Sequence, residues 1–99
     1  MMGEIVSRIR NYLPDAEVYL FGSSVNYRTA RGDVDIVVVS QRFDGVVSPK
    51  RRKMIVDWVD DSLIDPICLS QSEFRRFLEA NNEFAATVLP TLRRLEVEL

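Results

Sequence analysis

Residues 34–39 read VDIVVV, and five of these six residues are apolar and branched at Cβ. Side chains that branch at Cβ favour strands because they pack well on a pleated surface. The run therefore predicts a buried strand over 34–39, with Asp35 near its start.

The segments before this strand predict a helix followed by a second strand. Residues 18–21 are a short apolar run that stops at Gly22, which is typical of a buried strand. The polar stretch 23–32 is expected to hold a short helix around 24–29. Residues 3–13 predict an amphipathic helix that ends at Pro14, because their apolar side chains recur at helical spacing: Ile5, Val6, Ile9 and Leu13.

The segments after it continue the alternation of helices and strands. Residues 42–49 predict a loop with an Asp44-Gly45 turn. A strand is expected over 63–69, and Pro66 points to a sheet edge or a bulge because proline cannot donate to a strand ladder. Between them lies a second amphipathic helix, whose apolar stripe is Met54, Ile55, Trp58 and Val59. We expect Trp58 and Cys68 to be core residues.

The C-terminal third predicts two more helices and a last strand. Residues 70–73 read SQSE, which fits a capping box before a helix. A final helical segment is expected over 82–89, limited by Pro90, and the alternating tail 92–99 predicts a strand. The whole pattern predicts one α/β domain of α+β type over residues 1–99, with a small mixed sheet of about three or four strands packed with helices.

Composition excludes several kinds of chemistry. The 99 residues contain no histidine, so Ser-His-Asp and Cys-His nucleophile systems and imidazole-based zinc sites cannot be built within the chain. Cys68 can form no intrachain disulfide, which indicates a reducing compartment. There is no apolar run of about 20 residues and no signal-peptide pattern at the N-terminus. We therefore expect a cytoplasmic protein with no membrane span.

Charge argues against nucleic acid as a partner. The chain carries 13 Lys and Arg against 15 Asp and Glu, a formal net charge of −2. Proteins that bind nucleic acid through bulk electrostatics usually have a clear basic excess. The basic run 49–53, PKRRK, is accordingly interpreted as a solvated helix start rather than a nuclear signal or an RNA contact.

Two polar motifs frame the loop before the central strand. Gly22-Ser23 ends one strand and leads toward a helix, where free backbone N–H groups and a hydroxyl can hold a phosphate. Asp33 and Asp35 are two residues apart on a strand, so they share a face and suit Mg²⁺. Taken singly, the first is commonly a turn and the second a solvated or capping pair. Together they indicate metal-dependent phosphoryl or nucleotidyl transfer.

The pattern Gly22-Ser23-x9-Asp33-x-Asp35 resembles the motif of the DNA polymerase beta-type nucleotidyltransferase superfamily. In its short length the chain is similar to the minimal nucleotidyltransferases, a type often encoded beside a helical HEPN partner as an antitoxin. Residues 63–69 and 72–74 resemble the later strand that carries the third carboxylate of the family, here Asp65, and the helix after it. The resemblance covers nearly the whole chain and implies a polymerase beta-like fold.

The resemblance also implies a reaction and a role for each matched residue. Gly22 and Ser23 would hold the triphosphate of ATP or another NTP, and a nucleoside monophosphate would pass to a hydroxyl. Asp33, Asp35 and Asp65 would bind two Mg²⁺ ions, and Asp65 would help to take the acceptor proton. The short chain leaves little room for an acceptor domain, so the acceptor would sit on a macromolecular partner, plausibly a tyrosine of a HEPN-type toxin.

Two departures from the family pattern bear on this interpretation. Gly32 stands where the family often has serine, which affects only the turn. Pro66 directly follows Asp65 and could displace that strand from its neighbour, which would leave Asp65 as a plain strand-edge carboxylate.

Other basic residues leave alternatives open. Arg28 and Arg31 lie between the two motifs and could contact a triphosphate or simply be solvated. The second helix begins basic and ends acidic, which its dipole disfavours by about 0.3–1 kcal/mol per charge. A polyanionic substrate or an acidic partner surface could compensate.

Two other kinds of function remain in view. The chain could be a binding module that neutralises a partner by contact alone, without catalysis. A plain nucleotide-binding or RNA-contacting domain is less favoured, given the balanced charge. The sequence leaves open whether the protein forms a homo-oligomer or a hetero-oligomer.

Overall fold

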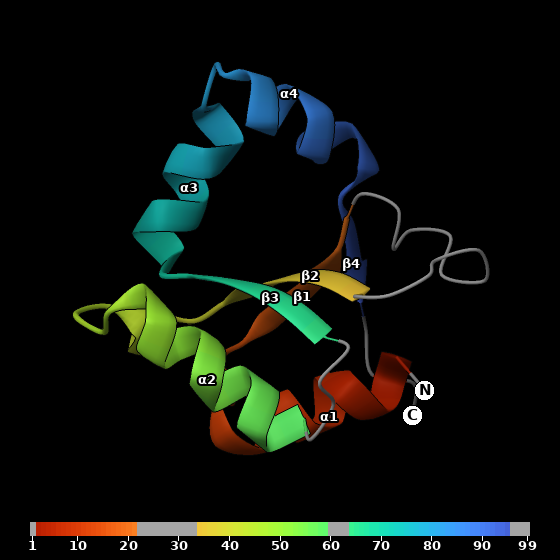
Figure 1. The fold of residues 1–99 in the computed structure, drawn as a ribbon, viewed down its shortest axis with the longest axis vertical. Coiled ribbons are helices and arrows are strands. Elements are labelled where there is room, and N and C mark those ends of the chain that lie inside the picture. The colour runs from red at the N-terminus through yellow and green to blue at the C-terminus, as the bar shows by residue number, and fades with distance from the viewer. Residues whose placement is uncertain (1, 22–33, 60–63, 96–99) are drawn as a thin grey trace.

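A four-stranded mixed sheet lies at the centre of the computed structural model, which describes residues 2–21, 34–59 and 64–95 (Figure 1). The strand order is β3-β2-β1-β4. Strands β2 and β3 are parallel, whereas β1 is antiparallel to both β2 and β4. The strands are β1 Glu17–Leu20, β2 Val34–Val39, β3 Ile64–Leu69 and β4 Arg93–Leu95. The predicted class, a small mixed sheet packed with helices, is confirmed.

Helices cover both faces of this sheet. Helix α1, Met2–Tyr12, and helix α2, Ser48–Val59, lie on one side, and α3, Gln71–Glu79, with α4, Glu83–Val88, lies on the other (Figure 1). Two cores result because alternate residues of a strand point to opposite faces. On β2, Ile36 and Val38 enter the first core, beneath α1 and α2, and Val37 and Val39 enter the second, beneath α3 and α4. This explains why the run 34–39 is apolar without interruption after Asp35.

The contact between α1 and α2 includes an aromatic stack. The rings of Tyr12 and Trp58 lie 4.5 Å apart between centroids and are nearly parallel. Trp58 is partly buried against the first core, and Cys68 is a buried member of it, as the sequence predicts.

The turn after α1 is tied to the end of β2. The Ser40 hydroxyl donates to one Asp15 carboxylate oxygen, and the Gln41 backbone N–H donates to the other, each at 2.8 Å. The predicted loop over 42–49 is shorter than expected, because a 3-10 helix spans Gln41–Phe43 and α2 begins at Ser48. Phe43 is fully buried and anchors this segment in the first core.

Pro66 lies within β3 without breaking its register. The pairing with β2 runs from Val34↔Ile64 to Val39↔Leu69, with Pro66 opposite Ile36. Strand β3 is at the edge of the sheet, which is one of the two alternatives that the proline predicts. An edge strand tolerates proline because the missing N–H can face away from the ladder. The predicted alternative, displacement of this strand from its neighbour, is therefore wrong.

The C-terminal elements begin and end where local signals predict. The Ser70 hydroxyl accepts from the Glu73 N–H, and the Glu73 carboxylate accepts from the Ser70 N–H, which completes the capping box of α3. Asn82 caps α4 through the Ala85 N–H. A 3-10 helix, Leu89–Thr91, contains the proline that limits α4. The predicted tail strand is confirmed over Arg93–Leu95, and residues 96–99 of it lie outside the described residues, as does the helix expected at 24–29.

In the part of the chain that the structure describes, no helix has the length and apolar character needed to cross a membrane.

Candidate active site at the paired ends of β2 and β3

Asp35 and Asp65 are direct register partners on the parallel strands β2 and β3. Neighbouring strands lie about 4.7–4.9 Å apart, and paired residues project from the same face. Both aspartates therefore lie on the face of the second core, where the following odd-numbered residues of the two strands are apolar. Both side chains are half-buried. Asp65, the third carboxylate that the family resemblance implies, therefore lies beside Asp35, the second.

The end of β1 reaches the same place. The Phe21 N–H donates to the Asp35 carbonyl at 3.3 Å, which extends the contact of β1 with β2 beyond the Leu20↔Ile36 pair. In the sequence, Gly22 follows Phe21 directly. The remaining predicted site residues lie outside the described residues, and their roles stay predictions: Gly22, Ser23, Arg28, Arg31 and Asp33.

Asp65 forms an ion pair with Arg52 of α2. The Arg52 Nη1 atom donates to Asp65 Oδ1 and lies 3.5 Å from the Pro66 carbonyl oxygen. Helix α2 covers the opposite face of the sheet, so the Arg52 side chain passes around the open edge of β3 to reach the carboxylate. About half of each side chain is exposed. Sequence reasoning missed this contact because the two residues come from different elements.

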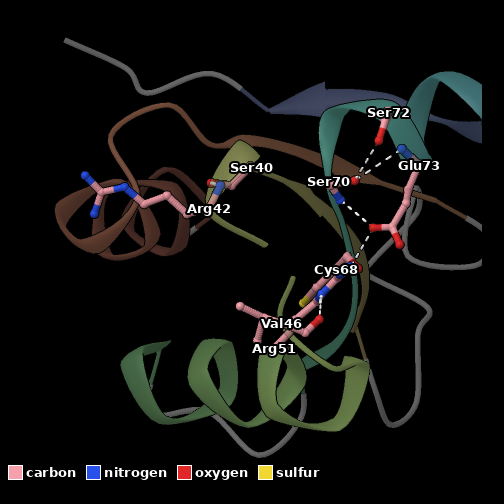
Figure 2. Close-up of polar contacts among 8 residues, drawn as sticks. All are labelled: Ser40, Arg42, Val46, Arg51, Cys68, Ser70, Ser72 and Glu73. Carbon is pink, nitrogen blue, oxygen red and sulfur yellow. Dashed lines mark hydrogen bonds and ion pairs between the residues drawn. The ribbon is translucent and has the colours of Figure 1, made fainter. Parts of the chain in front are cut away.

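The adjacent residue, Arg51, is buried, which corrects the interpretation of the basic run at this one position. Lys50, Arg52 and Lys53 are exposed in the first turns of α2, as the sequence predicts. The Nε of Arg51 donates to the Val46 carbonyl at 2.6 Å, and its Nη1 donates to the Cys68 carbonyl at 3.1 Å and to Glu73 Oε1 at 2.6 Å (Figure 2). Its guanidinium carbon also lies 5.7 Å from the centre of the Phe43 ring. Arg51 therefore joins α2, β3 and α3.

A sequence signal for this burial exists in the spacing of α2. Arg51, Ile55 and Val59 follow one another at intervals of four, and these three are the buried residues of the helix. Residues four apart lie on one helix face, so the arginine belongs to the inward stripe.

The unfavourable charge order of α2 is compensated inside the protein. Arg51 pairs with Glu73, Arg52 pairs with Asp65, and Lys53 pairs with Asp57 at 2.8 Å. Carboxylates of this chain thus neutralise three of the bases near the start of α2. No external polyanion is required to explain the order of charges.

The network around Arg51 sets the ionisation of its neighbours. The hydrogen bond from Arg51 holds the pKa of Glu73 below its usual value, and the Ser70 N–H acts in the same direction. Burial raises the pKa of the Cys68 thiol to about 12, although Arg51 and Arg52 oppose this. Cys68 is therefore a neutral core residue rather than a nucleophile.

The donors at the candidate site are carboxylate oxygens, which are the ligands that Mg²⁺ prefers. Asp35 and Asp65 provide two of the three ligands that the family resemblance implies. No cluster of three or more metal-ligating side chains occurs among residues 2–21, 34–59 and 64–95. The described pair fits a hard divalent cation in donor type, and Asp33 completes the predicted set.

The fold and the carboxylate pair define an α/β protein with a candidate site at one end of two parallel strands. Residues 2–89 match the nucleotidyltransferase domain family, so the chain belongs to this family. The sequence prediction of a nucleotidyltransferase is confirmed at this level.

Two solved structures are similar to the chain. One is a candidate nucleotidyltransferase from Sulfolobus solfataricus, with 27% identity and a TM-score of 0.58 over 76% of this chain and 68% of that one. The other is also a candidate nucleotidyltransferase, with 25% identity and a TM-score of 0.61 over 96% of this chain and 97% of that one. Among curated proteins, none matches the chain significantly.

Proposed function

We propose that this chain is a Mg²⁺-dependent nucleotidyltransferase that moves AMP from ATP to a hydroxyl group on a macromolecular partner. The observation that carries the proposal is the register pairing of Asp35 with Asp65. Like charges that lie directly opposite each other on neighbouring strands repel, and a divalent cation bound by both carboxylates would relieve that repulsion. Membership in the nucleotidyltransferase family supports a divalent cation and a nucleotide as the groups that fill this place.

Each proposed site residue has a defined task. Asp33, Asp35 and Asp65 hold the cation, and Gly22 with Ser23 holds the triphosphate. When bound, Mg²⁺ neutralises charge on the phosphates and lowers the pKa of the acceptor hydroxyl. The acceptor oxygen forms a bond to the α-phosphorus, the bond from that phosphorus to the bridging oxygen breaks, and pyrophosphate leaves. The acceptor proton passes to the Asp65 carboxylate and then to solvent.

We propose that the acceptor is a protein, specifically a tyrosine of a HEPN-type toxin, in a cytoplasmic toxin-antitoxin pair. Leu78 and Phe84 are large apolar residues that are about half exposed on α3 and α4, and they offer contact area to a protein partner. The buried, unpaired Cys68 is consistent with a reducing compartment.

A transfer assay tests the catalytic proposal. Purified protein is incubated with Mg²⁺, ATP labelled at the α-phosphate and the product of the neighbouring gene, which the proposal expects to be a HEPN-type protein. Wild-type protein should label that partner, and Asp35→Asn and Asp65→Asn should each slow the transfer by roughly 10²-fold or more. Asp57→Asn is the matched control, because Asp57 is an exposed carboxylate paired with Lys53 on α2. Equal rates for the Asp35 variant and the wild type would exclude the proposed site.

A second candidate function is neutralisation of the partner by contact alone. The ion pair between Arg52 and Asp65 favours it, because that pair occupies a carboxylate that catalysis requires. The Asp35→Asn/Asp65→Asn double variant separates the two functions. Full neutralisation of the partner by this variant supports contact alone, and loss of neutralisation together with loss of label supports catalysis.

A further inference from the structure

We propose that Arg52 is an internal competitor for the divalent cation at Asp65, so that the cation must displace its guanidinium before Asp65 can act as a ligand. This inference rests on the proposed function, because it concerns the same carboxylate pair. It adds a residue on α2 that adjusts the affinity of the site for its cation.

The geometry of the ion pair carries the proposal. Arg52 Nη1 donates a hydrogen bond to Asp65 Oδ1. A carboxylate oxygen is also the ligand that a hard cation would bind. Among the described residues, Arg52 is the one base that pairs with Asp65. A guanidinium in contact with the Asp65 carboxylate also repels a second positive charge that binds the same carboxylate. Occupation by Arg52 and ligation of a cation therefore oppose each other.

The side chain of Arg52 has room to move aside. It lines an apolar groove of about 380 Å³ along the open edge of β3, between the start of α2 and the strand. Its side chain is 50% exposed, and that of Asp65 is 41% exposed. Exposed ion pairs contribute little to stability, so separation of this pair does not require the fold to change.

The contrast with Arg51 sharpens the assignment. Arg51 is buried and donates to three acceptors, which fixes it as an anchor between α2, β3 and α3. Arg52 instead lies at the surface, on the side of the helix that meets the strand edge. Adjacent arginines of one helix thus have different roles: one holds β3 in place, and the other controls access to its carboxylate.

Binding of Mn²⁺ to the full chain, without nucleotide or acceptor, tests the proposal. Free Mn²⁺ is followed by electron paramagnetic resonance, so the measurement does not depend on catalysis. An exposed ion pair contributes a factor of about 1.5 to 5 in an equilibrium constant, so Arg52→Gln should bind Mn²⁺ about 1.5-fold to fivefold more tightly than wild type. Arg52→Lys keeps the positive charge, so its affinity for Mn²⁺ should stay close to that of wild type.

Lys53→Gln is the matched control. It removes one positive charge from the next residue of α2, where the lysine pairs with Asp57 rather than Asp65. Its affinity for Mn²⁺ should remain near that of wild type. The gain in Arg52→Gln should also shrink as KCl is raised, because salt screens the exposed pair that competes with the cation.

The outcomes separate this inference from the proposed function. If wild type binds Mn²⁺ and Arg52→Gln binds it with equal or lower affinity, the competition is overturned and the proposed function stands. An equal gain in Mn²⁺ affinity in Lys53→Gln also overturns the competition, because the gain would then come from the loss of any positive charge on α2. Binding that appears only in Arg52→Gln supports the inference in its strongest form. If neither protein binds Mn²⁺, both the inference and the proposed metal dependence fail.

Discussion

Replacement of Arg51 by methionine should destabilise the protein by about 3 kcal/mol. The side chain is only 7% exposed, and its removal takes donors from the carbonyls of Val46 and Cys68 and from the Glu73 carboxylate. A buried polar group left without a partner costs about 1–3 kcal/mol, and loss of one member of a buried ion pair costs about 3–5 kcal/mol. Glu73 is 34% exposed, so water can solvate it and the lower part of that range applies.

Urea denaturation followed by far-UV circular dichroism measures the loss in free energy of unfolding. For a domain of this size, 1 kcal/mol corresponds to about 4–8 °C in Tm, so thermal denaturation should show that Tm falls by at least about 10 °C. Lys50→Met is the control, because Lys50 is an exposed base of the same turn. Arg51→Lys should fall between the two, since an ammonium keeps the charge but loses the planar fork of donors. If Arg51→Met unfolds within 1 kcal/mol of Lys50→Met, the anchoring role of Arg51 is refuted.

The remaining predictions concern the groups that Arg51 contacts. The pKa of Glu73 is lowered, so its charged form stabilises the fold above its ordinary pKa of 4.5, and this contribution is lost as the pH falls further. The stability of wild type should therefore decline more steeply below that pH than the stability of Glu73→Gln, and parallel curves in acid denaturation would contradict this. The Cys68 thiol, with its pKa raised to about 12, should resist iodoacetamide at pH 8 and react once urea unfolds the chain. Alkylation at the rate of free cysteine in native buffer would disprove the burial.

Much of the fold was predictable because the signals are local. The run 34–39 is a strand because its side chains branch at Cβ, and it is central because it is apolar on both faces. Ser70 and Glu73 begin α3 through hydrogen bonds that span three residues. Pro66 indicated a sheet edge or a bulge because it lacks an N–H, and the structure shows the edge.

The candidate site was predictable in its residue types but not in its contacts. Carboxylates after a Gly-Ser motif indicated a cation and a phosphate, and the family is confirmed. The partner of Asp65 could not be read from the chain, because Arg52 lies 13 residues away on a helix that packs against the other face of the sheet. Nor was the burial of Arg51 foreseen, since the surrounding sequence is strongly basic.

The sequence alone was sufficient for the class of protein, the central strand and the acidic character of the site. The strand and the acidic character depend on side-chain chemistry and on short spacings within one element. The class of protein follows from a motif that can be read along the chain, Gly22-Ser23-x9-Asp33-x-Asp35. The tertiary structure was needed for the pairing of Asp35 with Asp65 and for the distinct roles of Arg51 and Arg52. Strand register and contacts around a sheet edge depend on how distant segments pack, and no local pattern specifies that packing.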